Sequence, residues 1–468
     1  MLSIYSALMQ KRVVLSAILL FVFILFLPSV RYGLVHDDMG QISLNPRLTA
    51  WSYVPGYFTS DVWAHLPANY HGYYRPLFLV WLRLSYAILG KPGDIWHLPS
   101  ILAHVAVTLC VFLLLLQLVK DFKGAALGAA LFAIHPIQTE TVAWISASGE
   151  MLLTIFLSLS VYFYVARKKP ISWASLVFAT LAMFTKETGI VAPLLILAFE
   201  WIQTRFRDAA VNAIPYFASA LFYLALRANA LGTLATAANS NLSLSAMLPT
   251  WPIVLAEYAL HLAWPVHLSP SYDIPTGSAL WPFLLLIVVV AALVWIIRKS
   301  SKFIQFGFAW FAITLAPTLI SHYVDPIDYV HDRYLYLPSV GLALMAAVWF
   351  ARLRFTVLRS VAASIVGFAL CCGTHQALPV WKDNISLFTR AVETAPDNPD
   401  MIIGLAASYM KAHREAEAYP LFQKLVDRYP DWPLANDLMA RYYQQIGNSD
   451  QAEYYFSISS RLSGTALQ

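Results

Sequence analysis

Long apolar runs recur along most of this chain, and they constrain its fold more than any other feature. A hydrocarbon core about 30 Å thick is crossed by about 20 apolar residues in a helix. Of the 468 residues, 59% are hydrophobic and 12% are charged, against roughly 45–50% and 25% in soluble domains. The sequence therefore predicts an all-α, polytopic membrane protein with about 11 transmembrane helices. The predicted spans are 12–30, 97–119, 124–140, 149–166, 171–185, 188–204, 209–228, 279–297, 303–321, 334–351 and 357–374.

The composition excludes several other classes of protein. The hydrophobic excess excludes a soluble enzyme or a disordered chain. The net charge of +5 is small and scattered, whereas a nucleic-acid binder needs a concentrated basic face. Cys110, Cys371 and Cys372 lie in apolar runs, so neither a disulfide framework nor a metal site is indicated.

The distribution of basic residues predicts which side of the membrane each loop occupies. Two shorter apolar segments, 76–89 and 251–266, contain charged residues, which are costly at mid-bilayer, so we place both at the interface. Fifteen of the 23 Lys and Arg residues before position 376 then fall in six short loops on one side. Because cytoplasmic loops are enriched in Lys and Arg, we expect a cytoplasmic N-terminus. Residues 31–96 then form the first extracytoplasmic loop.

The C-terminal part of the chain differs in composition and repeats with a period of 34 residues. Residues 376–468 contain 8 basic and 11 acidic residues, which predicts a soluble extracytoplasmic domain after a membrane domain, 1–375. Pairs at the 34-residue spacing include Ala406 with Ala440 and Tyr409 with Tyr443. This period is typical of tetratricopeptide repeats, so we expect a short α-solenoid. Such an array binds a peptide or protein partner, or it stabilises the membrane domain as a cap.

Ionisable residues from separate loops all fall at the predicted outer membrane boundary. Asp37 and Asp38 follow the first span, where the pair could also merely cap a helix that starts at Met39. Polar residues at lipid depth usually mark a functional site. The residues concerned are Asp37, Asp38, Arg75, His135, Glu140, Lys186, Glu187 and Arg333.

Carboxylates and cations in one layer supply the parts for transfer of a group from a lipid phosphate. A carboxylate can act as the base, and cations can stabilise a departing phosphate. Two other readings stay open. A transporter could use the same residues as a gate, although transporters usually bind substrate near mid-bilayer. A scaffold is possible as well, but it leaves the polar layer unexplained.

Several motifs in order resemble one enzyme family over nearly the whole chain. They are the Asp37-Asp38 pair, Tyr74-Arg75-Pro76-Leu77, His135-Pro136-x-x-Thr139-Glu140, Lys186-Glu187, Asp332-Arg333-Tyr334-Leu335-Tyr336-Leu337-Pro338-Ser339 and the terminal repeats. Together they resemble the transmembrane-and-tetratricopeptide-repeat O-mannosyltransferases of the GT-C superfamily. The predicted topology is also similar to that of the protein O-mannosyltransferases.

The resemblance implies roles for individual residues. It implies that Asp37 is the catalytic base and that Asp38 helps to orient the acceptor. It implies that Arg333, Lys186 and Arg75 bind the donor phosphate. It also implies that three further residues support the site; these are His135, Glu140 and Glu187.

The resemblance also implies the reaction and its partners. A single sugar moves from a polyprenyl-phosphate donor to an acceptor hydroxyl, with inversion, and no metal or other cofactor is expected. The acceptor is a protein Ser or Thr, or alternatively a glycolipid or polysaccharide. The short repeat array, with fewer than three complete units, suggests a prokaryotic form. We therefore expect a bacterial inner membrane with periplasmic repeats, or the endoplasmic reticulum in a eukaryote.

Overall fold

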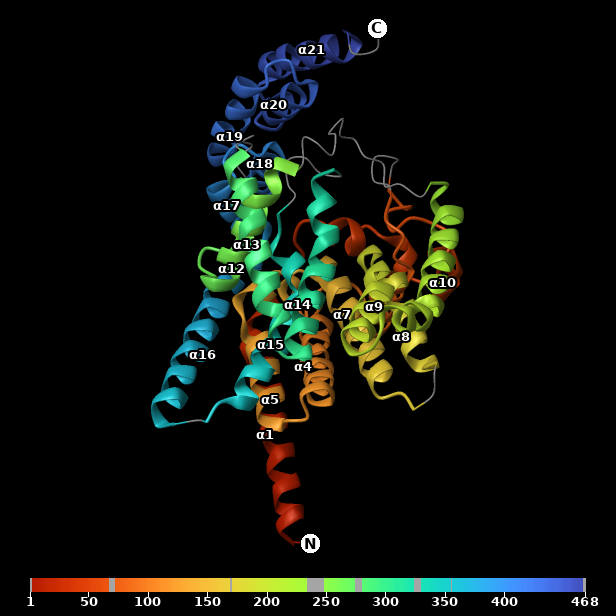
Figure 1. The fold of residues 1–468 in the computed structure, drawn as a ribbon. Coiled ribbons are helices and arrows are strands. Elements are labelled where there is room, and N and C mark those ends of the chain that lie inside the picture. Colours follow the sequence, from red (N-terminus) through yellow and green to blue (C-terminus); the bar gives the residue numbers. More distant parts are fainter. Residues whose placement is uncertain are drawn as a thin grey trace. The chain divides into compact units, whose positions relative to one another are not determined.

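The computed structural model describes residues 2–66, 72–168, 171–233, 248–273, 280–323, 330–354 and 356–465, and every regular element in these ranges is helical (Figure 1). The chain forms two compact units. The first comprises Met1–Leu268 and Ile274–Trp381, and the second comprises Ser269–Asp273 and Lys382–Gln468. The division falls after Trp381, beyond the predicted position 375, because helix α16 continues to Ala377. Residue 279, where one predicted span begins, and parts of loops 31–96 and 229–278 lie outside the described ranges.

The first unit is a multi-pass membrane protein body. Six helical segments are long and apolar enough to cross a bilayer, and five apolar helices are shorter. The predicted count of eleven spans therefore stays a prediction. The six long segments are Met9–Arg31, Leu98–Val119, Ile145–Val165, Phe206–Leu231, Lys302–Ile320 and Val357–Trp381, and the shorter ones are Pro76–Leu89, Phe122–Ile134, Trp173–Thr185, Leu284–Arg298 and Ser339–Arg352.

The helices of this unit are joined by short helical turns. The α-helices are α1 Leu2–Phe26, α2 Val54–Tyr57, α3 Pro76–Leu89, α4 Leu98–Val119, α5 Phe122–Ile134, α6 Thr139–Ala143, α7 Ser148–Val165, α8 Trp173–Thr185, α9 Ala192–Gln203, α10 Phe206–Leu231, α12 Trp251–Ala263, α13 Leu280–Arg298, α14 Lys302–Leu315, α15 Ser339–Arg352 and α16 Val357–Ala377. The turns are η1 Leu27–Arg31, η2 Met39–Ser43, η3 Pro46–Leu48, η4 Trp51–Tyr53, η5 Pro136–Gln138, η6 Ile145–Ala147, η7 Glu187–Val191, η8 Leu248–Thr250, η9 Ala316–Tyr323, η10 Asp332–Leu335 and η11 Leu378–Trp381.

Small residues let the central helices approach closely. α15 packs against both α5 and α14, and α4 packs against α5 and α7. A Cβ atom at Gly307 of α14 would lie 2.7 Å from the carbonyl oxygen of Gly341 on α15, and one at Gly128 would lie 2.7 Å from that of Ala343. Close backbone contact of this kind is typical of helix packing in membranes.

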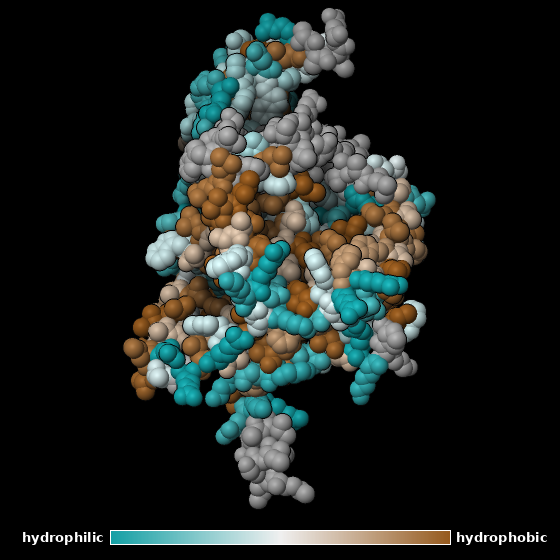
Figure 2. Space-filling model, viewed as in Figure 1, coloured by the Kyte–Doolittle hydropathy of each residue, from teal (hydrophilic) through white to brown (hydrophobic). Residues whose placement is uncertain are grey.

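The outward face of the membrane unit is apolar, as a lipid-facing surface requires. On α16, Val357 is 84% exposed and Phe368 is 72% exposed. Figure 2 shows apolar side chains over much of the visible face of the unit, with hydrophilic side chains gathered near the end from which α1 projects.

The first long loop folds back onto α3. Its short turns bury Ile42, Leu48 and Tyr57 against Phe78 and Leu82 of the helix. Pro76 occupies the first turn of α3, where its missing N–H is tolerated. Arg75 therefore stands at the N-terminus of the helix, beside the loop that carries Asp37.

The second unit is a short α-solenoid. Its helices are α17 Asn384–Thr394, α18 Pro399–Lys411, α19 Glu415–Arg428, α20 Pro433–Gln445 and α21 Ser449–Thr465. The starts of α18 and α20 differ by 34 residues, as do those of α19 and α21. The repeat predicted from the sequence is therefore confirmed. Segment Ser269–Asp273 joins this unit, since Ser269 and Ser271 hydrogen-bond to Thr394 at distances of 2.6 and 2.7 Å.

A side chain added at the α14–α15 contact is expected to destabilise the membrane unit. Gly307→Val should lower the free energy of unfolding by about 1–3 kcal/mol, because the new methyl groups meet backbone atoms. Thermal unfolding of the purified protein in detergent measures this effect. Gly367→Val is the matched control, since a Cβ at Gly367 meets only Ile134 at 3.9 Å. Equal midpoints for the two variants would contradict the close packing.

Candidate functional site

Three ion pairs bring together the cations predicted at the outer boundary. Arg333 pairs with Glu140, and Lys186 pairs with Glu150. Arg75 donates from Nε to Glu187 at 2.8 Å. The partners in these pairs are 193, 36 and 112 residues apart in the chain. The site is therefore assembled by the tertiary fold from six separate positions.

The backbone conformation around each of the three cations sets the position of its side chain. Lys186 is an extended residue between α8 and the turn η7, with φ −155° and ψ 146°. Arg333 lies in η10, and its backbone N–H donates to Glu140 at 2.9 Å. Arg75 precedes α3. Lys186 and Arg75 thus stand at helix ends, and Arg333 stands in a short helical turn.

Aromatic rings lie beside each of the three cations. The guanidinium carbon of Arg333 lies 4.9 Å from the ring centres of both Trp144 and Tyr334. Lys186 Nζ lies 5.6 Å from the ring of Tyr334, and Arg75 lies 4.6 Å from that of Tyr73. Cation–π contacts of this kind fix a cation without neutralising its charge.

Asp37 is the accessible carboxylate of the site. Its side chain is 34% exposed and lies 3.0 Å from Nδ1 of His36. Burial tends to raise the pKa of Asp37, but the charge and hydrogen bond of His36 and the charges of Arg333 and Arg75 lower it below the ordinary value. Asp37 is therefore ionised at neutral pH, within electrostatic range of two of the predicted donor-binding cations.

His36 ties this carboxylate to the aromatic wall. It has a left-handed backbone with φ 49°, which is uncommon for a residue with a side chain and often marks a functional site. Its ring packs edge-on to Trp144 at 5.6 Å. Trp144 in turn stacks on Trp381 at 5.8 Å. The same tryptophan therefore contacts both the group beside Asp37 and Arg333.

Asp38 is held by the chain itself, and its predicted role in orienting the acceptor stays a prediction. It is fully buried. Its Oδ1 accepts from Ser146 N at 2.8 Å and from Ser146 Oγ at 2.6 Å, and its Oδ2 accepts from Val35 N at 3.3 Å. Burial raises its pKa to about 7 despite these hydrogen bonds. Both oxygens of Asp38 thus accept hydrogen bonds from the chain, and these bonds tie its loop to Ser146.

Lys186 and Glu187 do not neutralise each other, although they are adjacent. Lys186 pairs with Glu150, whereas Glu187 pairs with Arg75, accepts from Tyr74 N at 3.1 Å and lies 3.6 Å from Arg227. Glu150 was missed in the sequence. An acid within an otherwise apolar span was the signal that could have identified it.

The remaining supporting residues join α12 to the site. Ile137 N donates to Nδ1 of His135, so Nε2 carries the proton and donates to the carbonyl oxygen of Leu262 at 3.1 Å. His261 of α12 lies 2.9 Å from Asp332, next to Arg333. His135 and Glu140 therefore hold the surrounding segments in place. Neither His261 nor Asp332 was predicted as a site residue.

No three His, Cys, Asp or Glu side chains in the described ranges lie close enough together to hold a metal ion. The expectation that no metal is needed stays a prediction.

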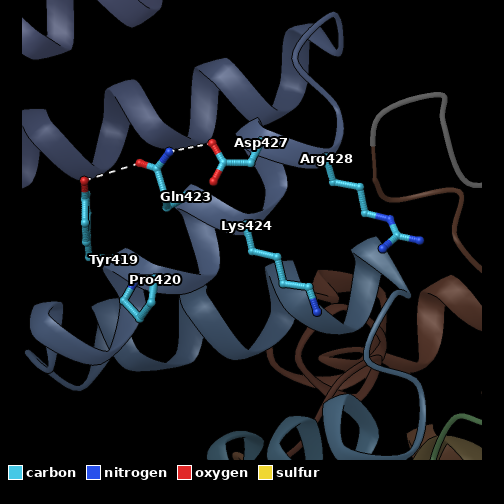
Figure 3. A pocket seen from close by; sticks show the side chains of 6 residues that line it. All are labelled: Tyr419, Pro420, Gln423, Lys424, Asp427 and Arg428. Carbon is cyan, nitrogen blue, oxygen red and sulfur yellow. Dashed lines mark hydrogen bonds between the residues drawn. The ribbon is translucent and has the colours of Figure 1, made fainter.

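The repeat unit has its own shallow hollow along α19 (Figure 3), lined by Tyr419, Pro420, Gln423, Lys424, Asp427 and Arg428.

Comparison with known proteins identifies similar chains. A tetratricopeptide-repeat family profile matches residues 382–442. A protein O-mannosyl-transferase of Caenorhabditis elegans is 24% identical over 78% of this chain and 55% of its own, and the protein O-mannosyl-transferase TMTC3 of Homo sapiens is 22% identical over 92% and 53%. This chain therefore spans about half the length of these curated relatives. They confirm the resemblance inferred from the motifs.

A solved structure is also similar to this chain. It is the crystal structure of the Archaeoglobus fulgidus oligosaccharyltransferase tethered with an acceptor peptide. Its sequence identity is 13% and its TM-score is 0.42, and the match covers 88% of this chain and 59% of the other.

The buried Asp38 is expected to make stability depend on pH. The folded state holds its proton up to pH about 7, whereas the unfolded state loses it near pH 3.8, so stability falls as pH rises between these values, by up to about 1.4 kcal/mol per pH unit. Asp38→Asn should remove this contribution. Thermal unfolding at pH 5 and pH 7 tests it, with the exposed Asp94→Asn as control. An unchanged pH dependence in Asp38→Asn would refute the assignment.

Proposed function

We propose that this chain is a membrane glycosyltransferase that moves one sugar from a polyprenyl-phosphate donor to an acceptor hydroxyl on the extracytoplasmic face, with a protein Ser or Thr as acceptor. The observation that carries the proposal is the ionised, partly exposed Asp37 within electrostatic range of Arg75 and Arg333. The similarity to protein O-mannosyl-transferases supports it.

In the proposed reaction, the carboxylate of Asp37 takes the proton of the acceptor hydroxyl as the oxygen attacks the anomeric carbon. The new carbon–oxygen bond forms while the bond from that carbon to the phosphate oxygen breaks. The phosphate leaves with the electron pair. A single displacement from the opposite face inverts the configuration at the anomeric carbon.

The cations stabilise the leaving phosphate in this proposal. Arg75 uses Nε for Glu187, which leaves its terminal nitrogens for a phosphate oxygen, and Arg333 and Lys186 add positive charge nearby. Preorganised charges at the position where charge develops are a large source of catalysis. Because the leaving group is a monophosphate, we propose that these side chains suffice without a metal.

The environment of the proposed site is the outer leaflet. The basic loops predicted to be cytoplasmic lie at the other ends of the spans that carry the site residues. We therefore propose a cytoplasmic N-terminus and a bacterial inner membrane, with the repeat unit in the periplasm. The lipid tail of the donor would then remain among acyl chains while its sugar enters the polar site.

Removal of the base is expected to abolish most transfer. Asp37→Asn should lower kcat about 10²–10⁴-fold, because the amide cannot accept the proton, while the amount of folded protein in the membrane stays unchanged. Sugar transfer from a radiolabelled polyprenyl-phosphate sugar to a Ser-containing peptide measures the loss. Asp94→Asn, which removes an exposed carboxylate of the same loop, should keep full activity. Full activity in Asp37→Asn would exclude its role as base.

The repeat unit distinguishes a protein acceptor from a glycolipid or polysaccharide acceptor. If the repeats recruit protein, a chain ending after Trp381 should lose most transfer to a folded protein acceptor and keep transfer to a small hydroxyl acceptor. The two rates measured on the same preparation test this. Equal retention of both, or transfer only to glycolipid, would exclude the protein-recruiting role.

A further inference from the structure

Arg83 is a buried cation that the proposed reaction does not use. It lies in the middle of α3 and is only 6% exposed. Its Nε and Nη1 atoms have no hydrogen-bond partner within the described ranges, and no acidic side chain there pairs with it. A buried charge without a counterion is costly, so an anion from outside the chain is expected.

Aromatic rings, rather than acids, surround this guanidinium. Its carbon lies 4.4 Å from the ring of Trp51 and 5.8 Å from that of Tyr86. The rings hold the guanidinium in position but accept no hydrogen bond from its free N–H groups. A planar guanidinium held in this way is well suited to paired hydrogen bonds with phosphate oxygens.

The surface around the site is apolar and exposed. Trp51 is 52% exposed, and Leu84, Ile88 and Ile95 are 42%, 79% and 49% exposed. The opposite face of α3 is buried by Phe78, Leu79 and Leu82. Exposed apolar side chains of this kind are suited to contact with lipid, so the anion would be accompanied by acyl chains.

We propose that Arg83, with the rings of Trp51 and Tyr86, binds the headgroup phosphate of a membrane phospholipid. This site is distinct from the catalytic cluster. The guanidinium of Arg83 lies beside Trp51 and Tyr86, whereas that of Arg75 pairs with Glu187 and lies beside Tyr73. The bound lipid supplies the missing counterion and fastens the first outer loop to the outer leaflet.

The proposal is tested with the full chain, delipidated in detergent. Short-chain phosphatidylglycerol should raise the unfolding midpoint of the wild type, and native mass spectrometry should show the bound lipid. Arg83→Met removes the charge while an unbranched side chain still fills the space, so this variant is expected to fold. It should need at least tenfold more lipid for the same shift, whereas Arg83→Lys should be intermediate. Lys91→Met, which removes an exposed cation of the same loop, should respond as the wild type does.

Further outcomes test the site and the identity of its ligand. Diacylglycerol, which lacks the phosphate, should give no shift, and inorganic phosphate alone should give none either. An equal shift in Arg83→Met and the wild type would overturn the site. A full shift with inorganic phosphate would overturn the lipid as its ligand, and so would binding of polyprenyl phosphate in place of phosphatidylglycerol. None of these experiments measures sugar transfer, so their results test the lipid site independently of the proposed reaction.

Discussion

A charge close to a membrane needs a partner of opposite sign, and this requirement organises the whole site. Arg333, Lys186 and Arg75 each pair with an acid from a distant segment. Truncating one partner of such a pair leaves a buried charge and is strongly unfavourable. The pairs therefore join η10 to α6, the residue after α8 to α7, and the residue before α3 to η7. A site built in this way exists only when the membrane helices are correctly packed.

The two adjacent carboxyl groups, Asp37 and Asp38, differ in burial and in pKa. Asp38 is enclosed by the chain and has a pKa of about 7, whereas the pKa of Asp37 is lowered by His36 and two arginines. The loop is thus anchored by one carboxyl group and offers the other to a substrate. Pairs of titratable groups separated by their environments are typical of active sites.

The sequence patterns predicted the type of fold well, but they predicted the contacts of individual site residues less well. Apolar runs and the 34-residue period depend on composition and spacing alone, so the membrane body and the repeats could be predicted. The partner of Lys186 could not, because Glu150 is 36 residues away and only packing of α7 against α8 brings them together. The burial of Asp38 could not be predicted either, because it depends on contact with Ser146, 108 residues away in the chain. Short helices such as α5 and α8 also leave the number of spans open, because length alone does not show which segments cross a bilayer.

The central claim is that lipid-linked phosphate and an ionised Asp37 meet in this site. Incubation of the purified protein with a panel of radiolabelled sugars, each attached either to polyprenyl phosphate or to a nucleoside diphosphate, tests it most directly. The account predicts that label passes to a hydroxyl acceptor from a polyprenyl-phosphate sugar, with inverted configuration, and from no nucleotide sugar. Transfer from nucleotide sugars alone, or a product with retained configuration, would contradict it.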